Sequence, residues 1–171
     1  PDGNLWITEA KGYKVVRMDP ATGDTTVVLN LQFDAVNTQA LSGLSTTQFN
    51  NYKRVFTNST SGAQAGFKWP QGGMMGMAFH PEFNTNPSKR FVYLAYVRTW
   101  VGKDDGNAGN GGYIGADGQG IYFTTMLTKW TYDPVLKKLV SPETIKNDIP
   151  GSSDHNSGRM IIAPVGSTNY L

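Results

Sequence analysis

The stretch Asn4–Leu29, NLWITEAKGYKVVRMDPATGDTTVVL, contains the pattern that decides the fold. Residues in Asn4–Ala10 alternate between two faces, which is the period of two expected of a half-buried strand. Two further strand-like runs, Lys14–Asp19 and Thr25–Leu29, are separated by Pro20–Asp24. Proline presets one turn dihedral there, and glycine supplies the positive one. We therefore predict a three-stranded antiparallel meander.

The strand pattern recurs later in the chain. A second unit has three predicted strands and a weaker fourth, namely Gly76–Phe79, Arg90–Val97, Ile121–Tyr132 and Thr144–Ile149. A strand in each unit ends in the same dipeptide, Asp19-Pro20 or Asp133-Pro134, and a further strand is expected at Arg159–Ala163. Sheets repeated along a chain are typical of propeller blades. We expect an all-β fold, a partial β-propeller of about two four-stranded antiparallel blades.

Length and composition agree with one domain of this kind. A chain of 171 residues is long enough for a single core, and its 20 Gly and 9 Pro supply the turns that short strands need. Two polar or glycine-rich segments, 32–70 and 101–120, interrupt the repeat, and we expect long loop insertions without core structure there. Residues 1–171 are thus predicted to be the N-terminal part of one propeller domain, cut inside the architecture at both ends.

Charge and cysteine content argue against several classes of partner. The net charge is +2, with acidic and basic residues interspersed, so no basic stripe suggests nucleic acid or an anionic membrane as a partner. The sequence has no run of about 18 apolar residues that would predict a membrane span. Without cysteine, disulfides, thiolate metal sites and cysteine nucleophiles are excluded.

The first candidate motif is the polar segment Gly151–Arg159, GSSDHNSGR, which contains one of only two histidines. Histidine has a reference pKa of about 6.5 and can act as a neutral base at pH 7, and an adjacent carboxylate can orient it or contact a substrate hydroxyl. The candidates here are His155 and Asp154. As a bare dipeptide in a loop, Asp-His is more often a hydrogen-bonded surface pair.

The second candidate motif is Trp69–Phe83, WPQGGMMGMAFHPEF. Gln71 precedes two glycines, which permit close approach of the backbone to a ligand, and its amide can both donate and accept hydrogen bonds. The alternative is a tight turn into an inner strand, with the three methionines packed in the core. His80, next to a proline at a strand end, is expected to be structural or capping.

Together, the two motifs lie in this order at the starts of successive predicted blades. They resemble the soluble glucose dehydrogenase and sorbosone dehydrogenase family, quinoproteins with a six-bladed propeller. The resemblance covers nearly the whole chain, as about one third of such a protein, and SSDHNSGRMIIAP is its most specific part. It implies a periplasmic or secreted oxidoreductase that oxidises the anomeric hydroxyl of an aldose to a lactone. Pyrroloquinoline quinone and calcium would be its cofactors, and an external electron acceptor its partner.

The same resemblance implies roles for three residues. His155 would be the general base, beside the cofactor, that takes the proton from the anomeric hydroxyl while hydride passes to the quinone. Asp154 would lie at the substrate end of the catalytic site, and Gln71 near both cofactor and sugar. No metal ligand is expected in this chain, since the calcium ligands and the basic residues for the quinone carboxylates would lie beyond Leu171. Arg159 fits the segment, but its role stays open between a site residue and an ion-pair partner.

Two other functions stay open. A calcium-dependent lactonase-type propeller shares the generic PDGNLWITE start, but it would centre on carboxylates and Asn around a metal. A non-catalytic binding propeller would present the same loops to a protein partner, although the two motifs at consecutive blade starts argue against it. In every case an unclosed propeller exposes sheet edges, so we expect further sequence, other chains or further copies to complete it.

Overall fold

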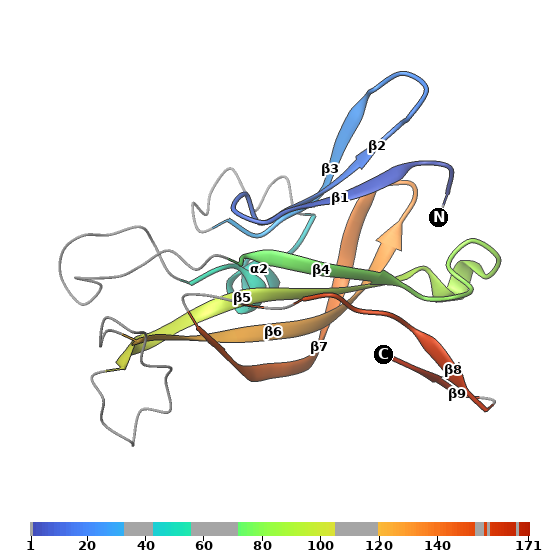
Figure 1. Cartoon of the computed structure of the whole chain (residues 1–171). Coiled ribbons are helices and arrows are strands. Elements are labelled where there is room, and N and C mark those ends of the chain that lie inside the picture. Colours follow the sequence, from blue (N-terminus) through green and yellow to red (C-terminus); the bar gives the residue numbers. More distant parts are fainter. Residues whose placement is uncertain are drawn as a thin grey trace.

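The computed structural model describes residues 2–32, 43–55, 72–104, 120–152, 156, 158–166 and 168–171. Within these ranges the regular structure is almost entirely β-strand, arranged in three separate antiparallel sheets. Figure 1 shows the two larger sheets side by side, with a small hairpin near the C-terminus. The all-β prediction is confirmed, and the arrangement is that of neighbouring blades of a partial β-propeller. None of the helices in the described ranges is long and apolar enough to cross a membrane.

The first sheet is the predicted meander. Its strands are β1 (Leu5–Glu9), β2 (Lys14–Met18) and β3 (Thr25–Asn30), paired in the order β1-β2-β3. The turn between β2 and β3 is closed by a 2.9 Å hydrogen bond from the Asp19 amide to the Asp24 carbonyl, and Gly23 adopts φ 78° there. Local alternation and turn chemistry are therefore sufficient to place these strands within a residue or so.

The second sheet has four strands, as predicted, in the order β4-β5-β6-β7. They are β4 (Met74–Phe79), β5 (Phe91–Asp104), β6 (Gly120–Asp133) and β7 (Lys138–Ser152). Two predicted strands were too short, since β5 continues seven residues beyond Val97 and β7 extends well past both ends of Thr144–Ile149. Both ends of the predicted loop 101–120 are thus strand, because pairing with β6 supplies the backbone partners that the local pattern does not reveal.

The segment 32–70 is not loop throughout, so the prediction that it contains no core structure is wrong. Helix α2 (Thr46–Tyr52) begins with a capping box, in which the Ser45 hydroxyl accepts from the Gln48 amide and the Gln48 side chain accepts from the Ser45 amide. Phe49 is buried in the core, as is Leu44 just before the helix. Even a polar segment can therefore contribute to the core through one short amphipathic helix. Residues 33–42 and 56–70 lie outside the described residues.

The predicted strand Arg159–Ala163 is wrong. Residues 158–162 form no strand; the strands come later, as the hairpin β8 (Ala163–Val165) and β9 (Thr168–Tyr170). Ile161, which the pattern placed in a sheet, is 73% exposed. The physical reason is that this backbone packs against the start of β4 at Gly158, instead of pairing with a neighbouring strand.

One hydrophobic core joins the two larger sheets. Trp6 of β1 contacts the rings of Phe79, Phe83 and Tyr132 edge-on, with centroids 5.0–6.0 Å apart. The buried Tyr13 hydroxyl donates a 2.8 Å hydrogen bond to the Val97 carbonyl of β5. The largest fully buried side chains come from both sheets and α2, and include Trp130, Tyr13, Tyr96, Phe49, Phe123 and Leu29. We call this pair of packed sheets, β1–β3 and β4–β7, the wedge. One end of it lies where β4 begins, and the other lies where β4 ends.

Candidate functional site

The three predicted site residues, Gln71, Asp154 and His155, lie outside the described residues, so their roles stay predictions. Their described neighbours in the sequence are Gly72 and Asn156. These neighbours lie at the end of the wedge where β4 begins and β7 ends, marked in Figure 1 by the start of the green strand. The backbone around them shows how the two motifs are arranged.

The two motifs are in direct backbone contact. A Cβ atom placed on Gly158 would lie 2.9 Å from the Gly76 amide nitrogen and would overlap the Met75 side chain. A Cβ atom placed on Gly76 would in turn overlap the Gly158 carbonyl. Such distances are shorter than any real side chain tolerates, so each position accepts only glycine without movement of the backbone. The glycines of both motifs are thus needed for the contact.

A second contact lies one step closer to the predicted catalytic residues. A Cβ atom on Gly72 would be 2.9 Å from the Asn156 Cβ atom, and it would also overlap the thioether of Met75. The Asn156 side chain itself reaches back to β7, where a Cβ atom on Gly151 would lie 2.7 Å from its Oδ1 atom. The chain after β7 therefore folds back over the entrance of β4.

The entrance of β4 is also held from the first sheet. The Met74 amide donates a 3.0 Å hydrogen bond to the Ala10 carbonyl, just after β1, and the Val97 amide of β5 donates a 2.9 Å bond to the Gly73 carbonyl. Gly73 has φ 148° and leaves no room for a Cβ atom beside the Ala10 carbonyl. The sequence predicted that these glycines allow close approach of the backbone to a ligand. In the structure, Gly73 instead allows close approach of the backbone to the first sheet.

The methionines of this motif pack as core residues, which was the alternative interpretation of the motif. Met74 is fully buried, and Met75 and Met77 are packed against the core cluster. This finding concerns the strand itself and leaves the role of Gln71 before it untested.

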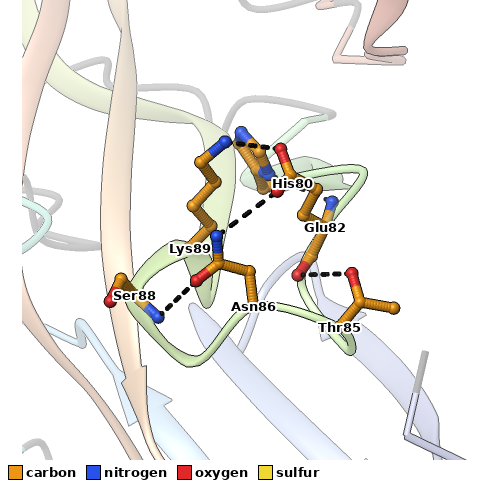
Figure 2. Close-up of polar contacts among 6 residues, drawn as sticks. All are labelled: His80, Glu82, Thr85, Asn86, Ser88 and Lys89. Carbon is orange, nitrogen blue, oxygen red and sulfur yellow. Dashed lines mark hydrogen bonds and ion pairs between the residues drawn. The ribbon is translucent and has the colours of Figure 1, made fainter.

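His80 lies at the opposite end of β4 and is structural, as expected. Its Nδ1 atom accepts a 3.1 Å hydrogen bond from the Glu82 amide, and its own amide donates to the Phe91 carbonyl at 3.0 Å. Figure 2 shows the surrounding turn, in which the Glu82 carboxylate accepts from both Lys89 and Asn86. Lys89, and then Asn86, hold the pKa of Glu82 below its usual value.

Arg159, matched to the end of the first motif, is exposed, and no described residue forms an ion pair with it. The role of Arg159 stays a prediction. Among the residues with described positions, no group of three or more His, Asp or Glu side chains gathers as a metal site would require. The predicted calcium ligands beyond Leu171 are not tested by this.

No protein-family model matches the chain. A curated relative, the quinoprotein glucose dehydrogenase B of Acinetobacter calcoaceticus, is 24% identical over 164 residues. The aligned region covers 96% of this chain and 25% of the relative, so the chain spans about a quarter of that protein's length. This distant similarity supports, at the level of the family, the resemblance drawn from the two motifs.

Proposed function

We propose that this chain supplies the base-containing part of a pyrroloquinoline-quinone-dependent sugar dehydrogenase, with His155 as the general base. The observation that carries the proposal is the glycine contact between the two motifs, Gly72 and Gly76 on one side and Asn156 and Gly158 on the other. The distant similarity to a quinoprotein glucose dehydrogenase supports the same conclusion independently of the geometry.

The contact bears on the site because two of the three predicted residues, Gln71 and His155, each adjoin one of its members. Gln71 precedes Gly72, and His155 precedes Asn156. Consecutive Cα atoms are about 3.8 Å apart, so both predicted residues are tethered to backbone that is packed together. A site that needs an amide and an imidazole at one ligand requires such a tether.

In this proposal the residues of this chain would meet only part of the cofactor. Gln71 and His155 would meet the polar atoms of the quinone, and the bound quinone would supply the hydride acceptor. The contact itself, from Gly72 to Gly76 and from Asn156 to Gly158, carries no cation for the carboxylates of the quinone. In line with the resemblance, we propose that the groups that hold those carboxylates, and the calcium ligands, lie in sequence outside this chain.

In the proposed reaction, neutral His155 accepts the proton of the anomeric hydroxyl of an aldose. Removal of that proton eases the loss of hydride from the anomeric carbon, which becomes the carbonyl carbon of a lactone. A positioned base of this kind contributes about 10²–10⁴-fold to the rate. Asp154 would contact a sugar hydroxyl and orient the ring.

The proposal extends to the setting of the enzyme. Electrons would leave through an external acceptor, and the protein would act in the periplasm or as a secreted protein. The remaining blades would come from further sequence, other chains or further copies, since among the described residues both larger sheets have unpaired edge strands, β1 and β3 in the first and β4 and β7 in the second.

The test uses the protein with its natural flanking sequence. After addition of pyrroloquinoline quinone and calcium, dye reduction is followed with a panel of aldoses. For the lactonase alternative, hydrolysis of lactones is followed separately by the release of acid. We expect aldose-dependent turnover, abolished in His155→Ala while quinone absorbance survives desalting. His80→Asn keeps an acceptor for the Glu82 amide and is the matched control, with turnover retained. Absence of turnover together with loss of all quinone absorbance on desalting would reject the dehydrogenase.

A further inference from the structure

A pocket lies at the end of the wedge that is away from the glycine contact. Its volume is about 560 Å³, and its lining includes Asp2, Arg17, Phe83, Arg90, Tyr132 and Lys137. Its lining comes from the N-terminal segment, β2, the segment after β4, and the end of β6 with the turn that follows. Figure 1 shows the N-terminus beside the hairpin between β6 and β7. Small-molecule sites have volumes of about 300–1,000 Å³, so the pocket is large enough for a ligand.

The lining is positively charged. Three cations, Arg17, Arg90 and Lys137, face one carboxylate, Asp2. That carboxylate already accepts hydrogen bonds from Arg17 Nε at 2.7 Å and Trp6 Nε1 at 3.1 Å. Although partial burial opposes it, these bonds hold the pKa of Asp2 below its usual value, so Asp2 stays charged and neutralises only Arg17. Asp133, beside Tyr132, is a second negative charge near the pocket but does not line it, and its Oδ1 atom accepts from the amides of Val135 and Leu136.

Two of the cations have no counter-ion within the part of the chain that the structure describes. Arg90 is half-buried and Lys137 is exposed, and neither side chain forms an ion pair or hydrogen bond with a described residue. The hydrogen bond from Arg17 to Asp2 uses Nε alone, so the terminal nitrogens of Arg17 likewise have no acceptor among the described residues. Guanidinium groups present paired donors that match the geometry of phosphate and carboxylate oxygens.

Two aromatic residues, Phe83 and Tyr132, also line the pocket. The rings of Phe83 and Tyr132 are stacked with centroids 5.9 Å apart. Burial raises the pKa of Tyr132, although the charges of Arg17 and Arg90 oppose the rise, so its hydroxyl remains a neutral hydrogen-bond donor. A pocket lined by both cations and aromatic rings suits a small molecule with an anionic group and a carbon skeleton.

We propose that this pocket binds a small anionic ligand through a phosphate or carboxylate group held by Arg17, Arg90 and Lys137. The carbon skeleton of the ligand rests against Phe83 and Tyr132. The site lies at the opposite end of the wedge from Gly72 and Asn156, so it does not depend on the proposed dehydrogenase.

Isothermal titration calorimetry on the protein with its natural flanking sequence tests the site with three probes: inorganic phosphate, phenyl phosphate and benzoate, at equal ionic strength. Saturable binding of phenyl phosphate but not benzoate identifies phosphate as the preferred group, and the reverse identifies carboxylate. Tighter binding of phenyl phosphate than of inorganic phosphate supports the contribution of the aromatic rings. Each charged contact contributes about tenfold to affinity.

Two substitutions locate the binding. Arg90→Gln and Lys137→Asn should each weaken binding about tenfold. Lys137 has φ 53° in an exposed turn, and asparagine tolerates that conformation, so this second variant preserves the fold. Lys89→Gln removes a neighbouring charge that is paired with Glu82 outside the pocket, and it should change affinity less than twofold. Equal losses in all three variants, or no saturable binding of any probe, would overturn the proposal.

Discussion

Gly76 and Gly158 meet backbone to backbone, although they belong to different motifs and to different parts of the fold. Each occupies the space in which a Cβ atom of the other would stand. Neither glycine has a positive φ in the structure, so close packing, and not backbone conformation, is the reason for glycine at both positions. The contact joins the segment after β7 to the start of β4.

Gly158→Ala is expected to destabilise the protein by about 1–3 kcal/mol, because the new methyl group would overlap Met75 and press on the Gly76 amide. The measurement is urea unfolding at neutral pH. Gly12→Ala is the matched control, since its methyl group meets only the flexible side chain of Glu9. Equal unfolding curves for the two variants would contradict the packing described here.

Gly72→Ala is expected to reduce activity more than stability, provided that the protein is the proposed dehydrogenase. Met75 can move its thioether, but Asn156 must shift from a Cβ distance of 2.9 Å, and His155 is attached to it. Small displacements of a catalytic group cost large factors in rate, so kcat/KM should fall about tenfold or more. Steady-state kinetics alongside thermal unfolding provide the comparison, and unchanged kinetics would show that the contact does not position the base.

Trp6→Ala is expected to cost about 2–4 kcal/mol, because Trp6 contacts three aromatic rings of the second sheet. Its Nε1 atom also donates to Asp2 at 3.1 Å. Leu5→Ala on the same strand is the control; Leu5 is 51% exposed, and its truncation should cost less than about 1 kcal/mol. A small effect of Trp6→Ala in chemical denaturation would mean that the sheets are held together elsewhere.

Buried tyrosines should make the fold sensitive to alkali. Burial raises the pKa of Tyr96, whose hydroxyl donates to the Tyr52 carbonyl at 2.8 Å. The folded state keeps this proton where the unfolded chain releases it, so the contribution is present below pH of about 10 and is lost as pH rises above it. Tyr96→Phe should flatten this decline between pH 9 and 11 in denaturant titrations. Tyr170→Phe, at an exposed site, should leave the decline in place.

Asp2 should affect how the free energy of unfolding changes at acidic pH. Its pKa is lowered overall by Trp6 and Arg17 despite partial burial. A lowered pKa stabilises the fold above pH of about 4, and the stabilisation is lost as pH falls through the folded-state value. Asp2→Asn should therefore reduce the loss of stability between pH 5 and 2. Asp148→Asn breaks a surface pair with Lys146 whose side chains are both more than half exposed, and its effect should be smaller. An equal effect of the two substitutions would show that Asp2 gains nothing from its partners.

The strands that the sequence predicted well are those with local signals. The β1–β3 meander follows from alternation and from the Pro20–Asp24 turn, and both are properties of neighbouring residues. The errors came where pairing is long-range. Residues beyond Val97 are strand because β6 lies beside them. Residues 159–162, which follow Gly158 where it packs on Gly76 of β4, pair with no strand among the described residues. Helix α2 was missed because its apolar positions are few, although Ser45 and Gln48 form a capping box that was visible in the sequence.

The sequence by itself determined the all-β class, the order of the strands and the two motifs that resemble the quinoprotein sugar dehydrogenases. Only the tertiary structure decided that Gly76 meets Gly158, and that Arg17 and Arg90 line one pocket at the other end of the wedge. The reason is physical. Alternation and turn preference act between residues a few positions apart, whereas these contacts depend on how two whole sheets pack around one core.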